Sequence, residues 1–318
     1  MKNDKVYIGY QSAIEYWRIH RSLPDDRALG RRKITLPIYP PTTGQVRSSG
    51  LSLPLHILLG CPDNRWASNT MKQHVYSGKV PAGCFVSAKD GLEVSSPEFC
   101  FLQMAMQLPL PGLIELGYEL CGTYSMLTAG GPDKYKSGLP ERPTLTSTKK
   151  ISDFVDQMTH FKGHANAVRA LRYVLEGSAS PMETIVAVLL TLPYRLGGFS
   201  LPIPKLNYRI ELSKIAKRSA NKEYFKCDLF WPDHNVAVEY DSNKYHSGPT
   251  QIEEDSKKRN TLDLMGIKVI TVTTGQLYHS NEFENVARLI AKRIGKRLVF
   301  KDPGFNVAYN ELRDQLLG

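Results

Sequence analysis

The pattern of hydrophobic and polar residues is most informative in the last third of the chain, where it predicts two β-strands joined by a turn. Residues 224–231 and 236–241 are rich in aromatic and β-branched side chains, which favour strands. The residues between them, Pro-Asp-His-Asn at 232–235, are typical of a turn. The pattern therefore predicts a β-hairpin in which Trp231 pairs with Val236.

The rest of the chain shows helical and strand-like periodicities in alternation. Helices are expected at 12–20, 97–108, 113–121, 152–161, 164–176, 251–265 and 281–294, with one more from residue 180 and another at the C-terminus. Further strands are expected at 52–59 and 268–273. After residue 180 the order of elements is α-β-β-α-β, which predicts an α/β (α+β) fold with a mixed sheet flanked by helices.

A change in composition divides the chain into two parts. Residues 129–150 are rich in Gly, Pro, Ser, Thr and Lys, which indicates a linker between domains or a loop that touches DNA. We therefore predict an α/β domain at 1–150 that ends in this linker. The second domain, at 151–318, consists of a helical connector followed by a core at 180–298.

The charge of the chain points to a polyanionic partner. The formal net charge is +10, and the regions before and after residue 180 are both positive. A basic surface favours nucleic acid as the first candidate partner. Because many soluble proteins are mildly basic without such a partner, charge alone gives this reading only a small advantage.

The cysteines and the apolar segments indicate in which cellular compartment we expect the protein. The five cysteines are scattered and include no C-x-x-C pair, which argues against a disulfide framework and a structural zinc site. The N-terminus has no apolar signal core, and no apolar run reaches the ~18 residues that span a bilayer. We therefore expect a reduced, cytoplasmic protein with no membrane partner.

The predicted hairpin gathers three acidic residues. Its register places Asp228 opposite Glu239, and Glu239 shares a strand face with Asp241. Cross-strand neighbours lie only ~5 Å apart, so the carboxylates repel one another unless a cation lies among them. Hard oxygen ligands suit Mg²⁺ or Mn²⁺. The sequence therefore predicts a metal site and phosphate chemistry.

These residues also carry a family resemblance. Asp228, ten intervening residues and then Glu239-Tyr240-Asp241 resemble the signature of PD-(D/E)XK nucleases, whose core is restriction-endonuclease-like. The likeness is greatest to the branch of very-short-patch-repair (Vsr) endonucleases, which often read E-x-D-G-x-x-H after the hairpin. Here the run is EYDSNKYH, with His246 at the last position. The resemblance spans residues 181–298.

One departure from the family pattern concerns charge. The better-known signature has Lys two residues after the metal-binding acid, where it stabilises the attacking water or the charge on the phosphate. This chain has Asp241 at that position, which removes a cation and adds an oxygen ligand. The role then passes to Lys258 or Arg259 on the next helix, or to a second metal ion.

The resemblance implies roles for the remaining candidates. Asp228, Glu239 and Asp241 would hold the metal, and His246 would donate a proton to the leaving oxygen or contact a phosphate. Glu183, on the helix before the hairpin, would lie near the metal. Ser180-x-x-Glu183 is also a capping box, and Arg259 is also spaced for an ordinary ion pair with Asp255.

The first 150 residues are similar to the C-terminal part of AbiEi-type antitoxins and regulators. The matching features are Ser12-Ala13 in an early helix and Gly-Leu-Glu-Val-Ser-Ser-Pro-Glu at 91–98 before an apolar helix. We expect the winged-helix segment that begins many of those proteins to be absent. The likeness implies an antitoxin or another defence-system protein as a possible partner.

Together these features predict a Mg²⁺-dependent endonuclease that hydrolyses DNA, in bacterial anti-phage defence, a toxin–antitoxin setting or repair. Two alternatives stay open. The chain is either a DNA-binding regulator whose nuclease-derived domain is inactive, or a nuclease that acts on RNA.

Overall fold

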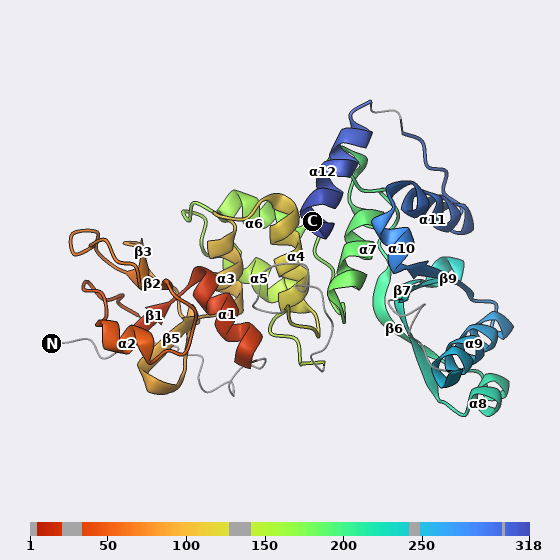
Figure 1. Ribbon diagram of the computed structural model, residues 1–318, viewed down its shortest axis with the longest axis horizontal. Coiled ribbons are helices and arrows are strands. Elements are labelled where there is room, and N and C mark those ends of the chain that lie inside the picture. Colours follow the sequence, from red (N-terminus) through yellow and green to blue (C-terminus); the bar gives the residue numbers. More distant parts are fainter. Residues whose placement is uncertain (1–4, 21–33, 127–140, 242–248, 301–302) are drawn as a thin grey trace. The chain divides into compact units, whose positions relative to one another are not determined.

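The computed structural model describes residues 5–20, 34–126, 141–241, 249–300 and 303–318. The fold is α+β: helices surround two sheets that each contain parallel and antiparallel strand pairs (Figure 1). The chain forms two compact units, Met1–Val174 and Leu175–Gly318. No helix in the described part of the chain is long and apolar enough to cross a membrane.

The first unit is built on a five-stranded sheet of order β3-β2-β1-β5-β4. Its strands are β1 (Val6–Ile8), β2 (Leu55–Leu59), β3 (Met71–Val75), β4 (Phe85–Ser87) and β5 (Leu92–Ser95). Its helices are α1 (Tyr10–His20), α2 (Thr43–Arg47), α3 (Pro97–Met104), α4 (Leu110–Cys121), α5 (Thr148–Val155) and α6 (His164–Leu171). Ser96 is the N-cap of α3, because its hydroxyl accepts the Phe99 N–H at 3.3 Å.

The boundary between the units lies later than the composition predicted. Helices α5 and α6, expected to belong to the second domain as a connector, pack on α3 and α4 of the first unit. The buried rings of Phe154 and Phe161 lie 5.8 and 5.9 Å from that of Phe99. Arg142, inside the predicted linker, donates from Nη2 to the Glu119 carbonyl at 2.6 Å. Residues 141–174 are therefore part of the first unit.

Two histidines meet at the β2–β3 pair of the first unit. His74 Nε2 lies 3.2 Å from His56 Nδ1, and the Tyr10 ring stacks on His74 with the ring centres 3.8 Å apart. Burial, together with the neighbouring His56 and Lys72, lowers the pKa of His74 to about 3. His74 is therefore neutral in the folded protein over the ordinary pH range.

We expect this histidine to make the first unit less stable in acid. Its folded-state pKa lies below its unfolded value, so its contribution is fully present above about pH 6.5 and is lost as the pH falls toward 3. Replacing His74→Gln should flatten the pH dependence of the unfolding free energy, by up to about 1.4 kcal/mol per pH unit. Urea unfolding at several pH values tests this, with exposed His160→Gln as the matched control. Equal slopes in the two variants would contradict it.

The second unit is built on a four-stranded mixed sheet of order β6-β7-β8-β9. Its strands are β6 (Lys205–Glu211), β7 (Tyr224–Trp231), β8 (Val236–Asp241) and β9 (Lys268–Thr273). Its helices are α7 (Pro181–Thr191), α8 (Lys214–Ala220), α9 (Pro249–Leu264), α10 (Thr274–Tyr278), α11 (Ser280–Arg293) and α12 (Phe305–Leu317). Helix α7 packs on β7 and β8, whereas α9, α10 and α11 pack on β9.

The hairpin register is the one predicted, because Trp231 pairs with Val236. Asn235 ends the turn in the left-handed conformation, with φ 51°, which Asn tolerates better than most residues. The sequence reasoning missed strand β6 and helix α8, so the order after α7 is β-α-β-β-α-β rather than β-β-α-β. The signal was present as strict alternation, with Leu206, Tyr208 and Ile210 separated by polar residues.

Candidate functional site

The candidate site lies where the β7–β8 ladder ends. The pairing of these antiparallel strands stops at Leu229 and Val238, one position before Asp228 and Glu239. The Asp228 side chain fills the place of a backbone partner, because its Oδ2 accepts the Tyr240 N–H at 2.7 Å. The end of the hairpin therefore holds an acidic side chain firmly between two strands.

Helix α7 supplies a second carboxylate. Ser180 caps the helix by accepting the Glu183 N–H at 3.1 Å, which is one half of the predicted capping box. The Glu183 side chain reaches past the cap residue, because its Oε2 accepts the Ala179 N–H at 3.0 Å and the Asn207 amide at 2.6 Å. Only 9% of Glu183 is exposed. This acid is therefore held inside the unit by a side chain of β6.

Sequence reasoning missed the residue that holds Glu183. Asn207 lies in the middle of β6, between the pairs Leu206–Leu229 and Tyr208–Cys227, and therefore opposite Asp228. Its φ of 45° is in the left-handed region, which is strained for most residues and commonest for Asn and Asp among non-glycine residues. An Asn inside an alternating strand was the available signal.

The carboxylates affect one another's protonation. Burial raises the pKa of Asp228 well above its usual value, and the negative charges of Glu183 and Glu239 raise it further. Burial also raises the pKa of Glu183, against the hydrogen bonds from Ala179 and Asn207 that lower it. The three acids therefore lie close enough to repel one another, as the sequence predicted for Asp228 and Glu239.

Helix α9 supplies the cation of the site. Lys258 Nζ donates to Glu239 Oε2 at 2.7 Å, and the two side chains are only 24% and 20% exposed. Burial lowers the pKa of Lys258, but the charge and hydrogen bond of Glu239, together with Cys227 and Asp228, outweigh it, and the pKa is raised. The ammonium therefore stays charged beside Glu239.

The charge at the site is not balanced by these residues. When all are ionised, the three carboxylates exceed the single ammonium by two negative charges. Glu239 Oε1 is buried and has no hydrogen-bond partner within the described ranges. Both observations fit a divalent cation with oxygen ligands. Among the described residues, however, no three His, Cys, Asp or Glu side chains already surround one ion position.

The other predicted site residues lie as follows. Asp241 ends β8 opposite Thr273 of β9, two residues beyond Glu239, and is partly exposed. Arg259 follows Lys258 on α9 and is exposed. His246 lies outside the described residues. The structure thus brings Glu183, Asp228, Glu239 and Lys258 together.

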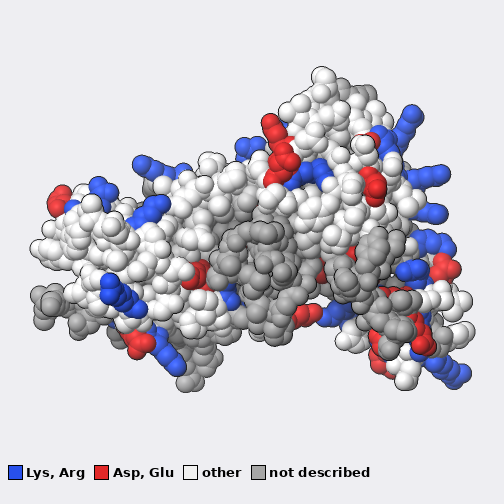
Figure 2. All heavy atoms as spheres, in the orientation of Figure 1, with Lys and Arg blue, Asp and Glu red and all other residues white. Residues whose placement is uncertain are grey.

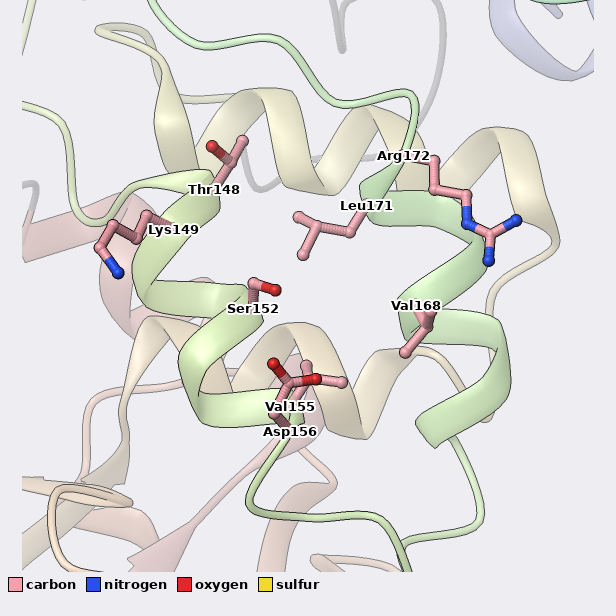
Figure 3. A pocket seen from close by; sticks show the side chains of 8 residues that line it. All are labelled: Thr148, Lys149, Ser152, Val155, Asp156, Val168, Leu171 and Arg172. Carbon is pink, nitrogen blue, oxygen red and sulfur yellow. The ribbon is translucent and has the colours of Figure 1, made fainter.

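A separate hollow of about 410 Å³ lies between α5 and α6 of the first unit (Figure 3). Leu171 and Ser152 point toward the space between the helices, whereas Lys149 and Arg172 extend to opposite sides. This mixed lining contains one acid, Asp156, and lacks the convergent charges of the cluster in the second unit.

Comparison with known proteins adds little about function. No family model matches the chain, and no solved structure matches it. Two proteins of Mycobacterium tuberculosis are similar to it: uncharacterized protein MT2308 of strain CDC 1551 / Oshkosh and uncharacterized protein Rv2248 of strain H37Rv. Each is 29% identical over 72 residues, which is 23% of this chain. The chain spans 24% of the length of each relative, and their names state no activity.

Proposed function

We propose that the second unit is a metal-dependent nuclease domain of the PD-(D/E)XK kind, which hydrolyses phosphodiester bonds of DNA. One observation supports the proposal above the others. Two acids at the end of a hairpin, a third on helix α7 and a lysine on helix α9 meet at one place, which is at least partly buried. A purely structural cluster would not need three carboxylates that raise one another's cost of burial.

In this proposal the residues divide the work between metal binding and charge stabilisation. Asp228 and Glu239 would hold Mg²⁺ or Mn²⁺, with Asp241 and Glu183 as further oxygen donors. When bound, such an ion would supply an activated water and neutralise charge on the phosphate. Lys258 supplies the positive charge of the family's lysine, which Asp241 replaces in this chain. Asn207 keeps Glu183 in position. Arg259 and His246 remain candidates for contacts to the phosphate.

A second candidate function is a DNA-binding regulator with an inactive nuclease-derived domain. The same Lys258–Glu239 ion pair favours it, because the ammonium satisfies Oε2 of Glu239 without any metal. The resemblance of residues 1–150 to AbiEi-type proteins supports a setting in bacterial defence, toxin–antitoxin pairing or repair for either function. An RNA substrate would require the same phosphate chemistry.

The test is cleavage of supercoiled plasmid by the purified chain in Mg²⁺, in Mn²⁺ and in EDTA, beside a Glu239→Ala variant. We expect nicked or linear DNA with metal, none in EDTA, and at least a ~100-fold loss of rate in the variant. A labelled RNA of the same length serves as the second substrate.

The other outcomes discriminate between the candidates. If neither protein cuts but both shift DNA in a salt-dependent way, the regulator is correct and the nuclease is wrong. Equal cutting by both proteins would place the activity outside the acidic cluster. Cutting of RNA alone would correct the substrate and leave the site unchanged.

A further inference from the structure

A second charged feature lies in the same unit, at the C-terminal end of helix α11. A hollow of about 490 Å³ is lined by Arg288, Lys292, Gly295, Lys296, Arg297 and Leu298. Four of these six residues are basic and none is acidic. Figure 2 shows Lys and Arg side chains gathered at the edge of the molecule where Figure 1 places α11. The hollow therefore has the charge of an anion-binding site.

The turn that ends α11 builds this hollow. Gly295 has φ 72°, which a glycine adopts without strain, and the Lys296 N–H returns to the Ala291 carbonyl at 2.8 Å. This turn reverses the chain, so Lys296 and Arg297 come back beside Arg288 and Lys292. Cations at a helix C-terminus also stabilise the helix dipole, but that effect is confined to the last turn. Lys296 and Arg297 lie beyond it.

Two of the four cations are anchored to other groups, and the other two are exposed. Arg288 donates to Glu284 Oε1, and its guanidinium lies 5.0 Å from the centre of the Phe300 ring. Lys296 donates to the Ser200 carbonyl. Lys292 and Arg297 are exposed, and within the described ranges neither has an acidic partner. Their charges are therefore available to an anion from outside the protein.

We propose that this hollow binds backbone phosphates of the nucleic acid on which the second unit acts. The proposal rests on the proposed function for the identity of the partner. It is supported by the link between the two features, because α11 packs on β9 and β9 pairs with β8, which holds Glu239. Phosphate contacts fix the position and affinity of the nucleic acid, and they read no sequence.

The test is binding of a fluorescent DNA duplex, followed by anisotropy in EDTA at several salt concentrations. The Lys292→Ala/Arg297→Ala double variant should bind at least ~10-fold more weakly at low salt. Each lost phosphate contact should reduce the slope of log affinity against log salt by about 0.9, so a decrease of between ~1 and ~2 is expected. The loss should be equal for unrelated duplex sequences.

The matched control is Lys89→Ala/Lys162→Ala, which removes the same charge from exposed positions of the first unit. A charge-retaining Lys292→Arg/Arg297→Lys variant should restore the slope. Equal effects of the two alanine pairs would overturn the proposal, as would a wild-type chain that binds no DNA.

Failure of this proposal is distinguishable from failure of the proposed function. A selective loss of binding in a chain that never cuts plasmid would support the hollow and reject the nuclease. A chain that cuts normally with the Lys292→Ala/Arg297→Ala change, at unchanged affinity, would reject the hollow alone.

Discussion

Replacing Asp228 by Asn is expected to stabilise the second unit in EDTA and to abolish metal-dependent cleavage. Burial and the charges of Glu183 and Glu239 make an ionised Asp228 costly in the folded state. An Asn has the same shape, and its carbonyl oxygen can still accept the Tyr240 N–H now bound by Asp228. We therefore expect the unfolding free energy at pH 8 to rise by about 1–2 kcal/mol, while the cleavage rate falls by at least ~100-fold.

The same variant should lose its response to metal. An ion that binds only the folded state stabilises it by about 2.7 kcal/mol at 100 times its Kd. Wild-type protein should therefore become more stable when Mg²⁺ or Mn²⁺ replaces EDTA, and Asp228→Asn should gain much less. Hydrogen exchange of residues 175–318 in urea measures the unfolding free energy in EDTA and its increase when metal is added.

The control for this experiment is Asp233→Asn, which removes an exposed carboxylate from the turn of the same hairpin. It should change stability by less than about 0.5 kcal/mol and leave cleavage intact. If Asp228→Asn instead destabilises the unit and the metal response persists, Asp228 is a structural acceptor and the metal site is wrong.

The opposite signs expected for stability and activity are typical of functional sites. Buried charges that repel one another are retained mainly where function requires them. An apolar or amide side chain in the same place usually makes the folded protein more stable. The backbone of Asn207 is strained in a similar way, because its left-handed φ is unusual for a residue inside a strand. Charge repulsion and backbone strain thus meet at one place in the second unit.

The part of the site predicted from sequence is the part set by local rules. The Pro-Asp-His-Asn turn and the strand alternation fix the hairpin register, and the register alone places Asp228 near Glu239. The sequence left Lys258, Arg259 and a second metal ion as candidates for the missing cation. The position of a residue in a helix determines the helix face on which it lies, but not what that face packs against. Its ion pair with Glu239 depends on how α9 lies on the sheet.

The misses have equally physical causes. Strand β6 was overlooked because the proline-rich residues just before it suggested an irregular segment, and Asn207 was overlooked with it. The domain boundary was placed at 150 because composition reveals a loop but not which unit the next helices pack on. The rings of Phe154 and Phe161 pack against Phe99, which places α5 and the segment before α6 in the first unit. This contact joins distant parts of the chain, so composition does not reveal it.

Replacing Lys258 by Met is expected to lower the rate of DNA cleavage far more than it lowers DNA binding. The Lys258 ammonium donates a hydrogen bond to Glu239, and its raised pKa keeps it charged there. Removing one positioned charge of this kind typically costs ~10²–10³ in kcat. Glu239 also loses its partner, so in EDTA the unit should be destabilised by about 1–3 kcal/mol. Single-turnover kinetics at saturating protein separate the chemical step from binding.

Three comparison variants make the Lys258 result specific. Lys258→Arg keeps the charge and should recover part of kcat, which a loss of fold would not allow. Lys257→Met removes the neighbouring exposed charge and should leave kcat unchanged. Arg259→Met tests the rival cation: if it abolishes cleavage while Lys258→Met does not, the cation role belongs to Arg259. In that case the Lys258–Glu239 pair is an inhibitory contact that metal must displace, and Lys258→Met should tighten Mg²⁺ binding rather than weaken it.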